Sequence, residues 1–319
     1  MENDVINVVL KHLINLTTEI SQGNYEQANA VFEYTRTGNY PPLVEELAES
    51  FGMMMVKVEA REFRLTQLVE ELRTKNVQLE ATLQKVKLLE NIKAHLGKFV
   101  PESVKRLIET APEAPDLEKR DRDVSVLFLD IAGYTSLSET VELKWMNYLI
   151  ERYFSSFLDD IYQNKGDINE TAGDGLMIIF QDDDPVRHAC NAAATAIAIQ
   201  QKVHKVNQDL KGSNKPINVN IGINSGIASV GSTRLEGFTG TRWTYTASGM
   251  VTNIAARLGA SATEGRIFIG PEIARRIRDK FNIQEMGKQH LKNVSEPVFI
   301  HQLIVEREPL RRIDGPCNT

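Results

Sequence analysis

The sequence predicts a helical N-terminal part followed by an α+β domain, and three observations lead to this expectation. Residues 56–96 contain no glycine or proline and repeat leucine or valine every seven positions, which is typical of a coiled coil. Beyond residue 120, short apolar runs have the length of buried strands, and longer amphipathic stretches between them predict helices. The 319 residues are enough for about two domains. We expect strands near 124–130, 176–180, 217–223, 226–230, 266–269 and 299–305, and helices near 142–163, 185–210, 249–259 and 271–278.

Residues 1–56 are expected to form a helical regulatory or dimerisation module. An apolar stripe at helical spacing begins it, made of Val5, Ile6, Val9, Leu10, Leu13 and Ile14. Gly-Asn-Tyr breaks follow at 23–25 and 38–40, and Pro41-Pro42 then starts a helix with a shared face of Leu43, Leu47, Phe51 and Met54 or Met55. Residues 47–53 resemble the second helix of a HAMP signal-relay module. The alternative is a dimerising helical hairpin without a sensing role.

Residues 57–96 are expected to form a coiled coil over about four heptads. The heptad seam consists of Leu65, Leu72, Leu79 and Val86. Asn76 lies near this seam, where it could fix the register of two helices. The alternative is a long amphipathic helix that packs on its own chain. Residues 97–120 then provide a short connecting helix and a proline-containing linker.

Composition excludes several classes of protein. The formal net charge of −6 and the lack of a basic cluster argue against a nucleic-acid partner. Apolar runs such as 178–180 are far shorter than the roughly 18–20 residues of a membrane span. The N-terminus lacks the basic region of a signal peptide, and two cysteines are too few for a disulfide framework or a zinc site. We therefore expect a soluble, cytoplasmic protein.

Two aspartates at the ends of apolar runs are the strongest candidates for chemistry. Asp130 ends the run 124–130, and Asp174 directly precedes the run 175–180. Strand pairing that brings two such carboxylates together creates a hard-oxygen site suited to Mg²⁺ or Mn²⁺, as in two-metal phosphoryl chemistry. The alternative is that each aspartate only caps a turn, as aspartate often does beside strands.

A third segment carries Asn253 and Arg257. These residues are four apart, so on a helix they share one face, while Ala255, Ala256 and Leu258 can pack on the opposite side. Taken alone, Asn253 is as well explained as a solvated helix residue and Arg257 as a surface cation.

The ordered set of these segments resembles the class III nucleotide cyclase catalytic domain over about residues 120–305. The matching pieces are Phe128–Thr135, Gly173–Gly175, Gly222–Gly226, Val230–Ser232, Tyr245-Thr246, Asn253–Leu258 and Leu291–Val298. Each piece is weak by itself, and the specificity of the match comes from their order and spacing.

The resemblance implies a role for each matched position. Asp130 and Asp174, with the main chain of Ile131, would ligate two divalent cations, Mg²⁺ or Mn²⁺. A helix would start after Asp130, so that the backbone N–H groups of 131–135 (Ile131, Ala132, Gly133, Tyr134 and Thr135) face phosphate oxygens. Asn253 would orient the ribose, and Arg257 would stabilise charge on the α-phosphate. Lys292 would bind phosphate. The 3′-oxygen would attack the α-phosphorus and pyrophosphate would leave.

Two positions of the family read the base. The first is Glu170, four residues before Asp174, and the second is Thr246, seven residues before Asn253. Adenylate cyclases of the family typically carry Lys at the first position and Asp or Thr at the second, whereas guanylate cyclases carry Glu at the first. An ionised Glu170 can accept from guanine N1–H and N2–H₂, which gives a slight preference for GTP over ATP. A protonated Glu170 could instead donate to adenine N1.

The resemblance also implies an architecture and a partner. Residues 121–306 would form an α+β, ferredoxin-like catalytic domain with an antiparallel-centred sheet and helices on one face, preceded by the all-α bundle and coiled coil, and followed by a tail at 307–319. The active site would form between two chains of a homodimer, Asp130 and Asp174 coming from one and Asn253 and Arg257 from the other. An upstream signalling partner could act through the N-terminal helices.

The expected function is a purine nucleotide cyclase, a lyase that makes cAMP or cGMP for signal transduction. The alternative is a catalytically silent, cyclase-like module that binds nucleotide or a signalling partner, and the unusual pair Glu170 and Thr246 keeps that alternative open. A related enzyme making cyclic dinucleotides is disfavoured, because its Gly-Gly-Asp/Glu-Glu-Phe signature is absent.

Overall fold

The structure is a computed structural model that describes residues 2–25, 28–36, 39–210 and 216–305. The chain divides into two compact units, an N-terminal unit at Met1–Ala94 and a C-terminal unit at His95–Thr319. The predicted tail at 307–319 and part of the second Gly-Asn-Tyr break lie outside the described residues. Within the described ranges, no helix has both the length and the apolar character needed to span a bilayer.

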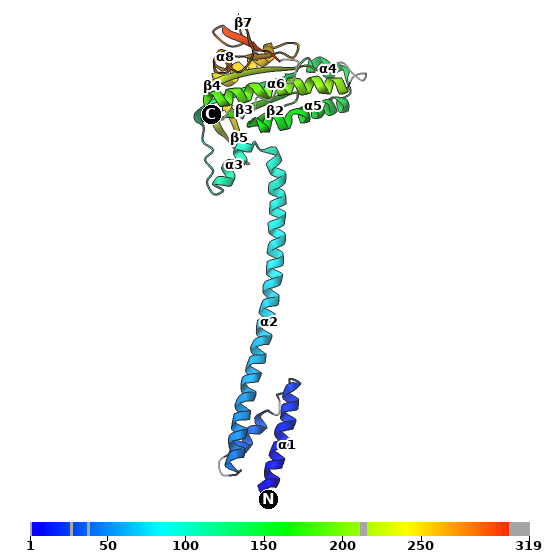
Figure 1. The fold of residues 1–319 in the computed structure, drawn as a ribbon, viewed down its shortest axis with the longest axis vertical. Helices are drawn as coiled ribbons and strands as arrows, with labels where there is room; N and C mark the ends of the chain where they lie inside the picture. The colour runs from blue at the N-terminus through cyan, green and yellow to red at the C-terminus, as the bar shows by residue number, and fades with distance from the viewer. Residues whose placement is uncertain (1, 26–27, 37–38, 211–215, 306–319) are drawn as a thin grey trace. The chain divides into compact units, whose positions relative to one another are not determined.

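The N-terminal unit contains α1 (Glu2–Ser21), the 3₁₀ helix η1 (Ala28–Thr35) and nearly all of α2 (Pro42–Leu96), whose first turns form a small bundle with the other two. The two α-helices run side by side in the same direction, and the connector between them returns to the starting end (Figure 1). The core of this small bundle consists of Val9, Leu13, Leu16, Val31, Val44, Ala48 and Met55.

The buried face of α2 differs from the predicted one. Leu43 and Leu47 are exposed, at 77% and 43%, whereas Val44 and Ala48 are buried. The reason is close packing against η1: a Cβ on Gly52 would lie 2.7 Å from the Phe32 ring. Small residues at 48 and 52 therefore turn toward the bundle, and Leu43 and Leu47 turn outward. The rest of the predicted face holds in part, since Met55 is buried and Phe51 is partly buried against the same core.

Beyond residue 58, α2 continues as one helix whose side chains are exposed through Leu96. The heptad residues Leu65, Leu72, Leu79 and Val86 are 45–60% exposed. Within the N-terminal unit, no other described element covers this seam, and the coiled coil stays a prediction.

The C-terminal unit is built around one eight-stranded sheet. Its strands are β1 (Arg120–Ile131), β2 (Gly166–Ala172), β3 (Gly175–Gln181), β4 (Val219–Gly237), β5 (Gly240–Ser248), β6 (Ile267–Ile269), β7 (Ile283–Gln289) and β8 (Val298–Leu303). Their order is β2-β3-β1-β4-β6-β8-β7, with β5 paired to β4. All pairs are antiparallel except β4 with β6. The unit β1-helix-β2-β3-helix-β4 is the expected ferredoxin-like arrangement.

Helices lie on both faces of this sheet. On one face, the main core packs α5 (Leu143–Gln163), α6 (Pro185–Asp209) and α8 (Pro271–Ile277) against the strands. On the other face, α7 (Met250–Ser261) packs over β4 and β1 through Ala255 and Leu258. The expectation that helices occupy a single face was therefore wrong for α7, the helix that carries Asn253 and Arg257.

The observed strands differ from the expected ones in two ways: two predicted strands are joined into one, and three strands were not predicted. The predicted pair 217–223 and 226–230 is one strand, β4, which continues through Gly226 at φ 145°. The prediction contained no β2, β5 or β7, because these strands are polar or lie at edges and lack an apolar run. Helix α4 (Tyr134–Thr140) begins where a helix start was expected after Asp130. The connecting segment contains η2 (Gly97–Phe99) and α3 (Glu102–Thr110).

Candidate active site

Asp130 is held near the end of β1, the central strand of the sheet. It pairs with Gly175 of β3 on one side and with Asn220 of β4 on the other. The preceding residues 124–127 and Leu129 are buried, which fixes the strand rigidly. The buried strand thus places the partly buried carboxylate of Asp130 at the edge of the core.

Asp174 reaches the same place through a two-residue hairpin. Ala172 pairs with Gly175, so Gly173 and Asp174 form the turn between β2 and β3. Gly173 has φ 60°, a left-handed conformation that glycine adopts without steric cost. Because Gly175 is the neighbour of Asp130 in the sheet, this tight turn sets the second carboxylate beside the first.

Burial and mutual repulsion act on the two carboxylates. Burial raises the pKa of Asp130, the negative charge of Asp174 raises it further, and the side chain of Asn220 opposes the rise. Burial also raises the pKa of Asp174. Oδ1 of Asp130 is buried without a hydrogen-bond partner among the described residues. A divalent cation would reverse these penalties, because it favours the ionised carboxylates.

The donor set fits a hard cation. The described residues contain no cluster of three or more metal-binding side chains. Two carboxylates are nevertheless what Mg²⁺ needs where substrate phosphates and water complete its octahedron. The residues present therefore suit a metal that arrives with a phosphorylated substrate.

The segment after Asp130 turns into α4 through Gly133, which has φ 70°. This is the predicted helix start, with Tyr134 and Thr135 in its first turn. The N–H of Ala132, however, donates to the carbonyl oxygen of Asn218 at 2.8 Å. That amide is used within the chain, which leaves the N–H groups closer to α4 as the candidates for a phosphate.

Glu170 and Thr246 meet directly although 76 positions separate them. The Thr246 hydroxyl donates to Oε1 of Glu170 at 3.1 Å. Glu170 lies in β2 just after a bulge at residue 169, and Thr246 lies in β5 opposite Gly231 of β4. The two positions that the sequence marked as base-reading residues thus form one polar pair on a single chain.

Asn253 and Arg257 lie one turn apart on α7, with Asn253 exposed and Arg257 partly exposed. The opposite side of α7 packs closely on β4: a Cβ on Gly222 would lie 2.0 Å from the main-chain nitrogen of Gly259. Glycine at 222 is therefore required for this approach, which fixes the height of α7 above the sheet.

The structure brings together some predicted residues and not others. Asp130 and Asp174 are neighbours, as are Glu170 and Thr246. Lys292 lies exposed in the turn between β7 and β8. Over the described ranges, neither aspartate has a hydrogen bond or ion pair with Asn253, Arg257 or Lys292. The two aspartates lie at the end of β1 and in the β2–β3 turn, whereas Asn253 and Arg257 lie on α7.

Asn220 is a residue of the site that the sequence analysis did not select. It is buried, neighbours Asp130 in the sheet, and accepts a hydrogen bond from the N–H of Gly265 at 3.1 Å. The sequence does contain a signal for this residue, because Asn220 interrupts an apolar run between Val219 and Ile221. A polar side chain in such a run is expected to be buried and to need a hydrogen-bond partner.

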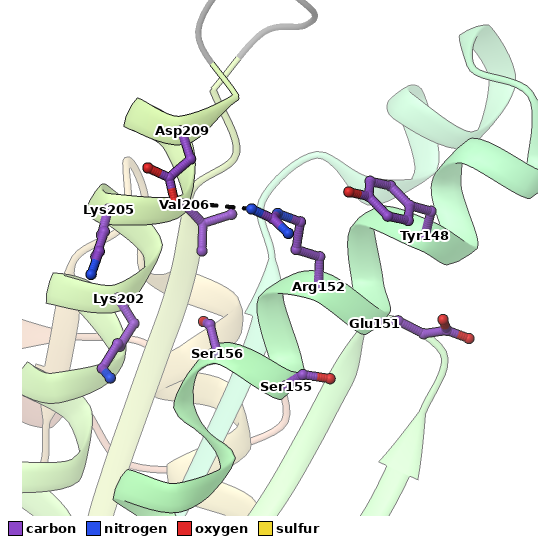
Figure 2. Close-up of a pocket in the computed structure, with 9 residues that line it drawn as sticks. All are labelled: Tyr148, Glu151, Arg152, Ser155, Ser156, Lys202, Lys205, Val206 and Asp209. Carbon is purple, nitrogen blue, oxygen red and sulfur yellow. Dashed lines mark ion pairs between the residues drawn. The ribbon is translucent and has the colours of Figure 1, made fainter.

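A hollow of about 530 Å³ lies between α5 and α6 (Figure 2). Basic and acidic side chains both line it, with Arg152 4.0 Å from Asp209. Nearby, Lys202 forms an ion pair with Asp160 at 3.5 Å. None of the predicted site residues lines this groove, and its mixed charge is that of a solvated surface between two helices.

Known proteins match the same part of the chain. Residues 117–304 match the family model for the adenylate and guanylate cyclase catalytic domain. Adenylate cyclase 1 of Rhizobium meliloti is 25% identical over 57% of this chain and 28% of its own length. The adenylate cyclase of Mycobacterium tuberculosis is 24% identical over 62% of this chain and 43% of its own length. The chain thus spans less than half of these curated relatives.

Solved structures agree with the fold. The adenylyl cyclase CyaB from P. aeruginosa has a TM-score of 0.54 and 29% identity, covering 60% of this chain and 98% of its own. The guanylyl cyclase Cya2 has a TM-score of 0.53 and 26% identity, covering 61% and 98%. The family model covers more than half of the chain, and the paired carboxylates lie inside it. The chain therefore belongs to the class III adenylate and guanylate cyclase family, whose catalytic domain it carries in residues 117–304.

Proposed function

We propose that the protein is a nucleotide cyclase that converts a purine nucleoside triphosphate into its 3′,5′-cyclic monophosphate and pyrophosphate, with a slight preference for GTP. The observation that carries this proposal is that Asp130 at the end of β1 pairs with Gly175, which places Asp174 of the β2–β3 turn beside it. Members of the family depend on divalent cations, and this carboxylate pair, the metal half-site of the proposal, has a buried, unpaired oxygen on Asp130 beside the negative charge of Asp174.

In this proposal, Asp130, Asp174 and the carbonyl oxygen of Ile131 hold two divalent cations, Mg²⁺ or Mn²⁺, together with phosphate oxygens. When bound, these cations lower the pKa of the ribose 3′-hydroxyl and neutralise charge on the triphosphate. The N–H groups at the start of α4 point toward the same phosphates, and Gly133 lets the backbone approach them.

The second half-site handles the ribose, the α-phosphate and the leaving group. Asn253 orients the ribose by hydrogen bonds, and Arg257 places its planar guanidinium against the charge that develops on the α-phosphate. Lys292, on the exposed β7–β8 turn, binds the triphosphate. Most of the rate enhancement then comes from positioning and fixed charge, because the reaction is intramolecular.

The contact between Glu170 and Thr246 supports guanine as the preferred base. The Thr246 hydroxyl already donates to Glu170, so both side chains offer lone pairs to an incoming base. Guanine presents N1–H and N2–H₂, which an ionised carboxylate can accept, whereas adenine N1 would face the carboxylate with a lone pair.

We also propose that the active enzyme is a homodimer with two equivalent sites. Each site would take Asp130 and Asp174 from one protomer and Asn253 and Arg257 from its partner, as membership of the cyclase family implies. The exposed heptad seam of α2 offers the upstream contact between protomers. Input to the N-terminal unit would then act by changing the twist or register of this coiled coil.

The test incubates the full chain with Mn²⁺ or Mg²⁺ and either GTP or ATP, and measures pyrophosphate and cyclic nucleotide. We expect both products in equal amounts, with a larger kcat/KM for GTP, and none from the Asp174→Asn variant. Nucleotide binding without product from either triphosphate would support the catalytically silent alternative. A chain of residues 110–319 that dimerises and works equally well would contradict the role assigned to the coiled coil.

A further inference from the structure

Helix α3 in the connecting segment is capped by a residue from a distant strand. Oδ1 of Asp167 accepts from the N–H of Glu102 at 2.8 Å, and Oδ2 accepts from the N–H of Ser103 at 3.2 Å and from its hydroxyl. The residue before the helix, Pro101, provides no side-chain cap. A helix is normally capped by its own flanking residue, so this cap ties α3 to β2.

Asp167 and Glu170 lie on the same face of β2 because of the bulge between them. Asp167 pairs with Ile179, and Glu170 pairs with Met177. Ile179 and Met177 both belong to the core cluster on the α7 face of the sheet. In a regular strand, residues three apart point to opposite faces, and the extra residue at 169 re-aims Glu170 toward the side that α3 occupies.

The C-terminal end of the connecting segment contacts β4 at the residues that pair with Thr246 and its neighbour. The carbonyl of Leu117 accepts from the N–H of Ser232 at 2.7 Å. Gly231 has φ 152°, and a Cβ there would lie 2.5 Å from the carbonyl oxygen of Glu118. Gly231 pairs directly with Thr246. The segment 97–119 is thus fixed at one end to the strand of Glu170 and at the other to the neighbour of Thr246.

We propose that Asp167 is a positioning residue for base selection, which sets Glu170 against Thr246 according to the position of α3. This inference rests on the proposed function and deepens it. One end of the connecting segment is bonded to β2, which carries Glu170, and the other end is bonded to β4, which pairs with the strand of Thr246. A displacement of α3 therefore changes the 3.1 Å contact between Glu170 and Thr246. The metal half-site is built on β1 and the β2–β3 turn, whereas α3 is tied to the opposite end of β2 through Asp167.

The test compares Asp167→Ala with Asp184→Ala in the full chain. Asp184 is a matched control because it also caps a helix, α6, through the N–H of Val186 at 2.9 Å, but it caps its own helix. We expect Asp167→Ala to change the ratio of kcat/KM for GTP over ATP by at least about fivefold, the lower end of coupling between sites. The ratio for Asp184→Ala should match the wild type.

A variant with a smaller change and a second measurement distinguish failure of this proposal from failure of the proposed cyclase activity. Ser103→Ala removes only the hydroxyl that donates to Asp167 and should shift the ratio in the same direction by less. Amide hydrogen exchange should accelerate in residues 102–110 and in 168–172 together in Asp167→Ala, but in neither for Asp184→Ala. Wild-type protein that forms no product refutes the proposed function, while the exchange data still decide whether the cap is coupled to the strand of Glu170.

Two outcomes would overturn the proposal. One is an Asp167→Ala protein that turns over nucleotide with the wild-type GTP-to-ATP ratio although exchange shows that α3 is released. The other is release of α3 with unchanged exchange in residues 168–172. Either result would reduce Asp167 to a helix cap that contributes only stability.

Discussion

Mixing two inactive variants should restore turnover if each site combines carboxylates from one protomer with the arginine of its partner. Asp130→Ala removes a carboxylate of the strand-end pair, and Arg257→Ala removes the cation of α7. In a heterodimer of the two variants, one site carries both substitutions and the other carries neither. The intact site has Asp130 and Asp174 from the Arg257→Ala chain and Arg257 from the Asp130→Ala chain.

The magnitude follows from counting sites. Random exchange makes about half of the dimers heterodimers, and each has one of its two sites intact, so the mixture should reach about a quarter of wild-type turnover. Co-expression with two different affinity tags and purification on both should give heterodimers with about half of wild-type turnover. The assay is pyrophosphate release with Mn²⁺ and GTP, beside each variant alone.

A matched mixture controls for nonspecific rescue. Asp130→Ala combined with Asp174→Ala places one substitution in the carboxylate pair of each site, so neither site is intact and no turnover should return. Purified Asp130→Ala and Arg257→Ala heterodimers that stay inactive would refute the shared site, and so would rescue in the Asp130 and Asp174 mixture.

Three further predictions follow from the same structure. Glu170→Lys should shift the GTP-to-ATP ratio of kcat/KM toward ATP by about 10–100-fold, since a hydrogen bond to a charged group is worth ~1.5–3 kcal/mol; an unchanged ratio would contradict the role of this residue. Leu72→Lys should weaken the dimer by at least about tenfold in sedimentation, because burying one leucine contributes ~1.5–3 kcal/mol, whereas Leu88→Lys, off the seam and equally exposed in the chain, should not. His188 is fully buried and bonds Ser125 at 2.8 Å, and burial lowers its pKa below 6.5. The unfolded chain then takes up a proton that the folded chain does not, so the free energy of unfolding should fall as pH drops below about 6.5. Urea unfolding followed by tryptophan fluorescence should show this fall in the wild type and a weaker one in His188→Gln.

The fluorescence measurement reports on the correct part of the chain. Both tryptophans, Trp145 and Trp243, lie in the C-terminal unit with His188. The charged groups that face this histidine are Asp123, Arg276, Asp182 and Asp184. Asp123 forms a two-point ion pair with Arg276 at 2.9 and 2.8 Å, so protonation of His188 adds a buried charge beside a cation that is already paired.

Strong local patterns allowed several elements to be predicted from the sequence. The apolar residues before Asp130 identify β1, because continuous burial on both faces of a central strand requires an apolar run. The heptads identify the long helix α2, since a helical repeat depends only on neighbours in the chain. The ordered motifs then led to the family, which the match over residues 117–304 confirmed.

Tertiary structure decided the features that depend on distant partners. β2 and β5 are polar strands that exist because β3 and β4 supply their hydrogen bonds, and only their pairing sets Glu170 beside Thr246. The cap of α3 by Asp167 spans 65 positions, and no local pattern encodes it. The buried face of α2 was set by Gly52 against Phe32 rather than by the largest apolar side chains. Periodicity shows which residues seek burial or pairing, but the partner of each residue is fixed only when the whole chain packs.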